Sequence, residues 1–170
     1  LIYRNAEAWN CDESHVAVLG FSAGGHLCSS AATLYKPGDP DSDDPVERLS
    51  SRPDAFIPCY GEVTLNDYTR PDSWMDSMRR VVDDPYQLPN FYITPNVTPD
   101  TPPAFIWHTA DDQVVSVQDS LALGAALAKN GMPFEMHIFP HGPHGLGLAE
   151  NAPDVAQWTG LCRRWLRGLG

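Results

Sequence analysis

An apolar run that ends in a glycine-flanked serine is the feature that most limits how this chain can fold. Residues 15–21 read His-Val-Ala-Val-Leu-Gly-Phe, a pattern typical of a fully buried strand in a parallel sheet. Gly24 and Gly25 then open an Ala- and Leu-rich stretch that continues to Tyr35 and favours a helix. The chain must therefore pass from strand to helix within a few residues, as it does in α/β proteins.

Further strand-like and helix-like segments follow in alternation. Three more strands are expected at residues 55–60, 104–108 and 134–139, and Pro58 indicates a strand end or a bulge in the first of them. Apolar residues at helical spacing predict helices at residues 117–129 and near the C-terminus, and Tyr3, Ala6 and Trp9 give a helix-like pattern at the start. We therefore expect one domain over residues 1–170, of the α/β class, with a mostly parallel sheet and flanking helices.

The segment 62–103 is too long for a simple connection between two strands. It is rich in proline and aromatic residues, and long excursions of this kind usually act as lids or binding insertions. We expect a cap or binding insertion here, in which Tyr68, Trp74 and Tyr86 contribute to a substrate-binding platform for a sugar or an aryl group.

Charge argues against nucleic acid and membrane surfaces as partners. The formal net charge is −11, so the chain should repel phosphate backbones and anionic lipids. No apolar run approaches the roughly 20 residues that span a bilayer, and the first residues do not have the pattern of a signal peptide.

A homo-oligomer is compatible with the sequence. The chain begins at Leu1 inside a helix-like pattern, so we expect a segment upstream.

The cysteines indicate a reducing compartment. Cys11, Cys28, Cys59 and Cys162 form no CxxC pair, and a chain of this length does not need disulfides for stability. We interpret all four as buried free thiols and expect a cytoplasmic location.

Residues 20–24 read Gly-Phe-Ser-Ala-Gly and match G-x-S-x-G between a predicted strand and a predicted helix, which is the context that this motif requires. The tight turn would expose the hydroxyl of Ser22 as a nucleophile. Side chains at Gly20 and Gly24 would collide with neighbouring backbone. The backbone N–H of Ala23, in the first helical turn, would stabilise a developing oxyanion.

A serine nucleophile needs a base and an acid that orients the base. Asp111 lies just beyond the third strand and is our preferred acid, with Asp112 as the alternative. His144, between Pro143 and Gly145 on a loop after the fourth strand, is the preferred base, and His141 is the alternative. Each predicted member follows a different parallel strand, and the sites of open α/β sheets assemble at that edge.

The remaining histidines are interpreted as structural. His26, four residues after Ser22, should pack against the core beneath the turn, and the other histidines share no metal-ligand spacing. We expect neither a metal nor an organic cofactor.

Three motifs together resemble the α/β-hydrolase superfamily, and more narrowly its bacterial esterase/lipase branch, which includes acetyl-xylan and other carbohydrate-ester esterases. They are residues 20–27, residues 101–112 and residues 140–148. The resemblance covers roughly the C-terminal 60% of such a fold. It implies Ser22 as nucleophile, Asp111 as acid and His144 as base. The N-terminal strands and the His-Gly-Gly-type loop that supplies a second oxyanion N–H have no counterpart here, which would leave the first strand with an unpaired edge.

These observations predict a serine carboxylic-ester hydrolase that acts on a small-molecule or carbohydrate ester through an acyl-enzyme. One alternative is a peptidase of the prolyl-oligopeptidase type, although the chain carries no appended propeller. Another is a catalytically incompetent hydrolase fragment or binding module that keeps the triad residues without a finished oxyanion hole.

Overall fold

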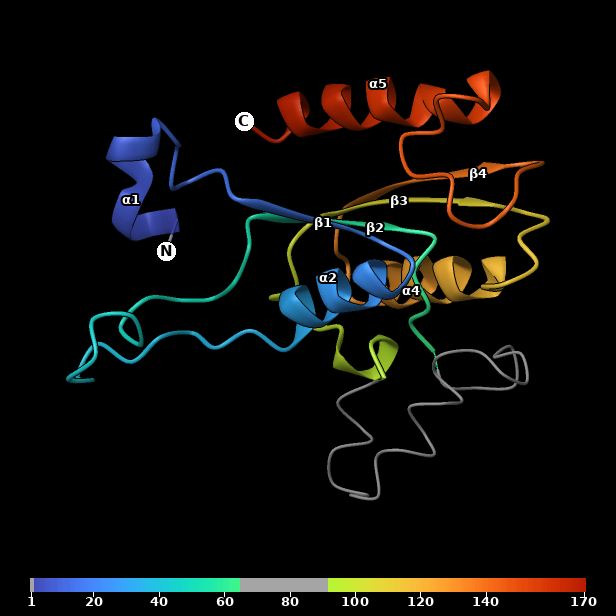
Figure 1. Cartoon of the computed structure of the whole chain (residues 1–170). Coiled ribbons are helices and arrows are strands. Elements are labelled where there is room, and N and C mark those ends of the chain that lie inside the picture. Colours follow the sequence, from blue (N-terminus) through green and yellow to red (C-terminus); the bar gives the residue numbers. More distant parts are fainter. Residues whose placement is uncertain (1, 65–91) are drawn as a thin grey trace.

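The computed structural model describes residues 2–64 and 92–170, and its centre is a parallel sheet (Figure 1). The strands are adjacent in the order in which they occur along the chain. They are β1 (Ala17–Phe21), β2 (Ala55–Cys59), β3 (Ala104–Thr109) and β4 (Phe134–Phe139). The predicted α/β class is confirmed, and the C-terminal ends of all four strands point to the same edge of the sheet.

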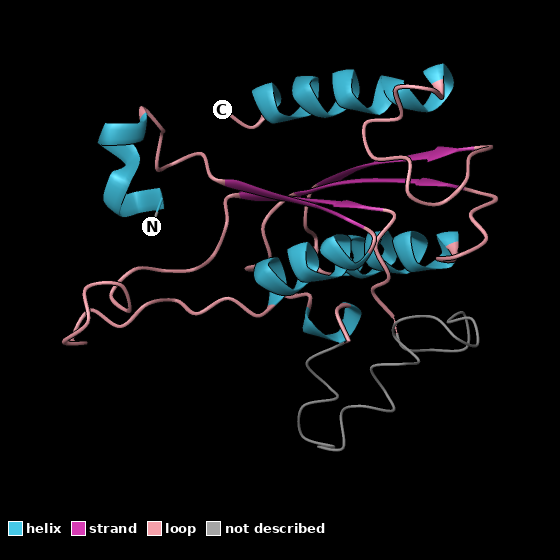
Figure 2. Cartoon of the chain, viewed as in Figure 1, coloured by secondary structure: helices cyan, strands magenta, loops and turns pink. Residues whose placement is uncertain are grey.

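Helices cover both faces of this sheet (Figure 2). They are α1 (Ile2–Trp9), α2 (Ala23–Thr33), α4 (Val117–Lys129) and α5 (Pro153–Gly168), with a short 3-10 helix, η2, at Thr94–Asn96. Helices α2 and α4 lie on one face and α5 lies on the other. Among residues 2–64 and 92–170, no helix is both long and apolar enough to cross a membrane.

The core under α2 and α4 also includes both ends of the 62–103 segment. Val63 on one side, and Ile93 and Val97 on the other, are at most 5% exposed and pack with Phe56 and Leu127. The N–H of Ile93 donates to the carbonyl of Val63 at 3.1 Å. The two ends of the segment are therefore fixed side by side on the domain. Tyr68, Trp74 and Tyr86 lie outside the described residues.

Aromatic residues dominate the core under α5. Trp107 of β3 stacks on Trp158 of α5 with ring centroids 5.2 Å apart and an interplanar angle of 20°. Phe105 packs against Trp165 in the same layer. Because successive residues of a strand face opposite sides of the sheet, Phe105 and Trp107 reach α5 while Ile106 faces the other core.

Pro58 lies inside β2, so the expectation of a strand end or bulge is wrong. The pairing of β2 with β1 runs through it, with Gly20 opposite Pro58. On the β3 side, the N–H groups of Phe56 and Tyr60 donate to the carbonyls of Pro103 and Trp107. The nitrogen of Pro58 points in the same direction as these two, because N–H groups alternate along a strand. The proline therefore costs the sheet a single hydrogen bond between β2 and β3.

Strand β1 is at one end of the strand order and pairs only with β2 among the described residues. Its Leu19 is 45% exposed, whereas every residue of β2 and β3 is buried. The predicted unpaired edge of the first strand is thus present in the described part of the chain.

Three of the four cysteines are buried free thiols, as expected. Burial raises the pKa of Cys28 to about 12 and that of Cys162 to about 11, so these thiols are unreactive at neutral pH. Cys11 is also free but is exposed, because it lies just beyond the end of α1 and outside the core. The expectation that it would be buried is wrong.

Candidate active site

Ser22 occupies a strained turn between β1 and α2. Its backbone has φ +55° and ψ −119°, a conformation that non-glycine residues rarely adopt. The N–H of Ser22 donates to the carbonyl of Cys59 at 3.0 Å, and its own carbonyl accepts from Gly25 and His26 at 2.8 and 3.2 Å. The surrounding hydrogen bonds therefore hold the serine at the C-terminal edge of the sheet.

The glycines of this turn have different roles from those expected. A Cβ atom at Gly20 would lie 1.9 Å from the carbonyl oxygen of Gly24, so the first glycine is required. A Cβ atom at Gly24 would meet nothing within 4 Å, and the expectation that crowding requires this glycine is wrong. At Gly25, the next residue, a Cβ atom would lie 2.8 Å from the Cα atom of Gly61. Close packing of α2 against the end of β2 thus requires Gly25.

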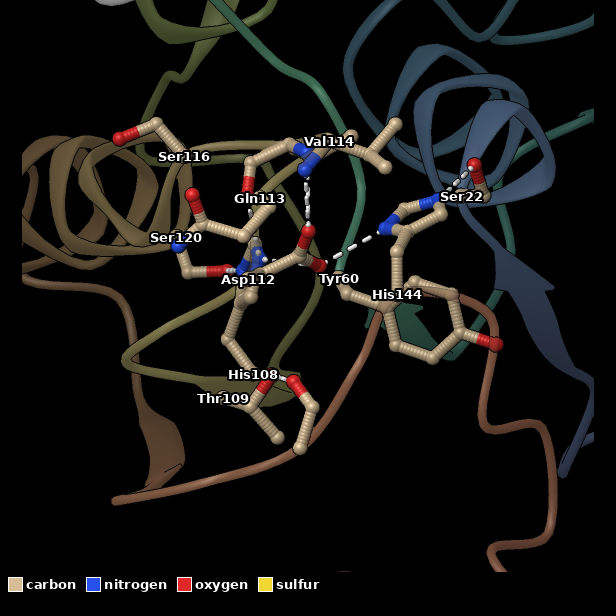
Figure 3. A network of polar contacts seen from close by, with 12 residues as sticks. Ser22, Tyr60, His108, Thr109, Asp112, Gln113, Val114, Ser116, Ser120 and His144 are labelled. Carbon is tan, nitrogen blue, oxygen red and sulfur yellow. Dashed lines mark hydrogen bonds and ion pairs between the residues drawn. The ribbon is translucent and has the colours of Figure 1, made fainter.

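His144 lies between Ser22 and a buried carboxylate (Figure 3). Its Nε2 atom is 2.7 Å from Oγ of Ser22, and its Nδ1 atom is 2.7 Å from Oδ2 of Asp112. The side chain of His144 is 16% exposed and that of Asp112 is 1% exposed. The geometry therefore brings together Ser22 and His144 as expected from the sequence, but with the alternative aspartate.

The expectation that Asp111 would orient His144 is wrong. Asp111 Oδ1 accepts the N–H of Gly142 at 2.8 Å, and its Oδ2 is 3.0 Å from Nδ1 of His141. Both side chains of this second pair are exposed. The N–H of Asp112 donates to the carbonyl of Thr109, which closes a turn after β3 and directs the two successive aspartates to different sides. Asp112 contacts the imidazole of His144, whereas Asp111 binds the backbone of the loop that carries His144.

Asp112 is ionised in spite of its burial. Burial acts to raise the pKa of this carboxyl, but hydrogen bonds from His108, from His144 and from the backbone N–H groups of Val114 and Val115 outweigh it and hold the pKa well below its usual range. The two backbone groups donate to Oδ1 at 2.8 and 3.0 Å. The site thus keeps a negative charge beside Nδ1 of His144.

The loop that carries His144, residues 140–149, is fixed to the domain at two places. Oγ1 of Thr109 donates to the carbonyl of Gly142 at 2.8 Å. Further along, the N–H of Gly147 donates to the hydroxyl of Tyr60 at 2.9 Å, and Nε1 of Trp158 donates to the carbonyl of Gly147 at 3.2 Å. These bonds lie on either side of His144 in the sequence and hold its backbone.

Tyr60 also contacts the imidazole directly. It follows β2 with φ +39°, and its ring meets that of His144 nearly edge-on, with centroids 5.1 Å apart. Sequence reasoning did not single out Tyr60 or the buried His108. Both follow the rule that was applied to the triad, since each lies at the C-terminal end of a parallel strand.

His26 has the structural position that was predicted for it. It is 2% exposed, and its Nδ1 atom is 2.9 Å from the carbonyl oxygen of Glu62. Burial lowers its pKa. Within residues 2–64 and 92–170, no three His, Cys, Asp or Glu side chains gather in a way that could hold a metal ion.

The chain is similar to known proteins in sequence and in fold. The model of the BD-FAE family matches residues 1–127. The chain is 40% identical to an acetyl ester-xyloside bifunctional hydrolase from Caldicellulosiruptor lactoaceticus, whose crystal structure superimposes with a TM-score of 0.86 over 99% of this chain and 62% of that one.

Two curated relatives cover most of this chain but only part of their own length. Endo-1,4-beta-xylanase B of Butyrivibrio fibrisolvens is 36% identical over 162 residues, which are 94% of this chain and 25% of that protein. An acetylxylan esterase of Xylanibacter ruminicola is 28% identical over 87% of this chain and 29% of its own. The chain therefore spans between 25% and 29% of the length of these relatives.

The structural matches show an α/β-hydrolase fold. The family model covers three quarters of the residues, from α1 through the turn at Ser22 to near the end of α4. This chain belongs to the BD-FAE family.

Proposed function

We propose that this protein is a serine carboxylic-ester hydrolase in which Ser22, His144 and Asp112 form the catalytic triad. The observation that carries the proposal is the pair of 2.7 Å contacts that His144 makes, one to Oγ of Ser22 and one to Oδ2 of Asp112. Nucleophile, base and orienting acid are recognised by such geometry rather than by their positions in a sequence.

The contacts support a sequence of proton transfers. Oγ of Ser22 attacks the ester carbonyl carbon while its proton passes to Nε2 of His144, and the ionised Asp112 stabilises the imidazolium through Nδ1. The tetrahedral intermediate collapses, the bond to the alcohol oxygen breaks, and His144 returns the proton to the leaving alcohol. Water, deprotonated by the same nitrogen, then attacks the acyl carbon. The bond to Oγ of Ser22 breaks, His144 returns the proton to Oγ, and the carboxylic acid is released.

The N-terminus of α2 supports a role for Ala23 in binding the oxyanion. The helix begins at Ala23, directly after Ser22, and the N–H groups of a first turn have no acceptor within the helix. The N–H groups of Gly25 and His26 already donate to the carbonyl of Ser22. That of Ala23 lies next to the nucleophile and is assigned to the developing negative charge.

We further propose an acetylated carbohydrate as the substrate class. The names of the relatives support it, since one is an acetylxylan esterase and another an acetyl ester-xyloside hydrolase. The aromatic residues Tyr68, Trp74 and Tyr86, known here from the sequence alone, suit the face of a sugar ring. Replacement of Trp74 by alanine should then raise KM for a glycosyl acetate more than for a minimal aryl acetate, which would not reach it.

Covalent labelling tests the proposed chemistry. A fluorophosphonate should modify the protein once, and peptide mapping should place the label on Ser22. Ser22→Ala should abolish both labelling and turnover of a short-chain aryl acetate, whereas the control Ser14→Ala, in an exposed turn, should change neither. Stoichiometric labelling at another serine, or ester turnover that survives Ser22→Ala, would refute the assignment. Hydrolysis of a peptide bond at the same serine would favour a peptidase instead.

A further inference from the structure

A second histidine is buried against the carboxylate of Asp112. His108, near the C-terminal end of β3, has no exposed side-chain surface. Its Nε2 atom lies 3.2 Å from the carbonyl oxygen of Val115 and 3.4 Å from Oδ2 of Asp112. Its Nδ1 atom is 2.8 Å from Oγ of Ser120 on α4. Each ring nitrogen of His108 thus faces oxygen atoms, although this histidine does not touch Ser22 or His144.

The partners of His108 fix where its proton resides. Nε2 faces only acceptors, a carbonyl and a carboxylate, so this nitrogen must carry hydrogen. Nδ1 faces a serine hydroxyl, which can donate to a neutral ring or accept from a protonated one. In either state, the N–H at Nε2 donates to the carbonyl of Val115, and Oδ2 of Asp112 lies beside it at 3.4 Å.

Both oxygen atoms of the Asp112 carboxylate have partners (Figure 3). Oδ1 accepts the two backbone N–H groups of the turn, and Oδ2 lies between the rings of His144 and His108. Since the backbone bonds reach only Oδ1, the two histidines are the groups that fix Oδ2 among the described contacts. Of these, only His108 is independent of the proton that moves during catalysis.

We propose that His108 is a positioning residue, which holds Oδ2 of Asp112 in place for the Nδ1–H group of His144 and is itself held by Ser120. The proposal rests on the triad assigned above, and it adds two residues from β3 and α4 to the support of that triad. Without His108, the carboxylate of Asp112 would be free to rotate about the hydrogen bonds that Oδ1 accepts from Val114 and Val115. A displacement of about 1 Å at a reacting centre costs on the order of 100-fold in rate.

The experiment compares two replacements at this position. His108→Gln keeps an N–H donor near the position of Nε2, whereas His108→Phe keeps a ring of similar size without a donor. We expect His108→Phe to lower kcat on an aryl acetate by about 10- to 100-fold with little change in KM, and His108→Gln to retain most of kcat. Ser120→Ala should give a smaller loss of the same kind, and it leaves the buried imidazole in the core.

A matched control is available on the neighbouring strand. His137 of β4 is paired with Trp107, directly before His108, and its Nε2 atom contacts Glu135 away from the triad. His137→Phe should leave kcat, KM and the spectroscopic signal described below unchanged. Thermal melts of every variant show which of them are folded.

Proton NMR separates this proposal from the proposed function. The Nδ1–H proton of His144, shared with Asp112, should give a low-field resonance whether or not an ester is hydrolysed. The signal should shift or broaden in folded His108→Phe or Ser120→Ala and should persist in His108→Gln. If the wild type shows the signal but hydrolyses no ester, the proposed function fails and the NMR comparison still decides the role of His108. The proposal would be overturned if folded His108→Phe had an unchanged kcat and an unchanged resonance. Equal losses of kcat in His108→Gln and His108→Phe would also overturn it. If His108→Phe does not fold, an unchanged resonance in Ser120→Ala would overturn it instead.

Discussion

Nδ1 of His144 lies 2.7 Å from Oδ2 of Asp112, while the preceding residue, Asp111, binds the backbone of the same loop at Gly142. Two adjacent carboxylates thus support one histidine in different ways. The inner carboxylate is buried and contacts the imidazole, and the outer one is exposed and holds the loop. A difference of one residue in the turn after β3 decides which of them can act on the imidazole.

The two aspartates should therefore differ strongly as asparagine variants. Asp112→Asn should lower kcat by about 10⁴, because an amide favours the wrong tautomer of His144. Asp111→Asn keeps an oxygen for the N–H of Gly142 and should cost far less. Steady-state kinetics on an aryl acetate compare the two variants. The reverse ranking would return the catalytic role to Asp111.

The glycines around Ser22 should tolerate alanine very unequally. Gly20→Ala places a Cβ atom 1.9 Å from the carbonyl of Gly24, and such overpacking costs about 1–3 kcal/mol or more. Gly24→Ala meets open space within the first turn of α2 and should be neutral or stabilise by up to about 1 kcal/mol. Denaturant unfolding measures both changes. Equal destabilisation by the two variants would contradict the geometry of this turn.

Acid should destabilise the protein partly through Asp112. The pKa of this carboxyl is lower in the folded protein than in the unfolded chain, so the unfolded chain binds more protons as the pH falls below about 5, and stability falls with it. Asp112→Asn cannot titrate and should lose about 1 kcal/mol less between pH 6 and pH 3. The free energy of unfolding, measured by denaturant titration at both pH values, gives the comparison.

The control for this measurement is Asp41→Asn, in the exposed acidic loop after α2. It should lose as much stability as the wild type over the same interval. If Asp112→Asn also shows the wild-type loss, the carboxyl of Asp112 does not have a lowered pKa in the folded state.

Loss of the Tyr60 hydroxyl should loosen the loop of His144 without removing the aromatic contact. Tyr60→Phe keeps the ring against the imidazole but leaves the N–H of Gly147 without its 2.9 Å acceptor, at a cost of about 1 kcal/mol. We expect faster amide exchange within residues 140–149 and a modest fall in kcat. Tyr35→Phe, two residues beyond the C-terminal end of α2, is the control and should change neither. Unaltered exchange in Tyr60→Phe would show that Trp158 and Thr109 suffice to hold the loop.

Local pattern alone predicted most of the fold. Residues 117–129 and 134–139 form α4 and β4 with the expected bounds, because helical and strand spacing of apolar residues reflects which faces must leave water. Pro58 misled the prediction, since the cost of a proline in a strand depends on which neighbour its nitrogen faces. Only the pairing of β2 with β1 and β3 shows that a single hydrogen bond is lost.

The candidate site was likewise predicted in part from local sequence patterns. The glycine-flanked turn and the small-residue loop after β4 are local signals, and they predicted Ser22 and His144 as members of the site. The sequence by itself did not decide between Asp111 and Asp112, since both occupy the same turn and a change of one residue reverses the direction of a side chain. Only the tertiary structure places one carboxylate within 2.7 Å of Nδ1 of His144 and buries His108 behind it. These contacts join strands that are distant in the sequence, and their geometry depends on how the whole sheet packs against its helices.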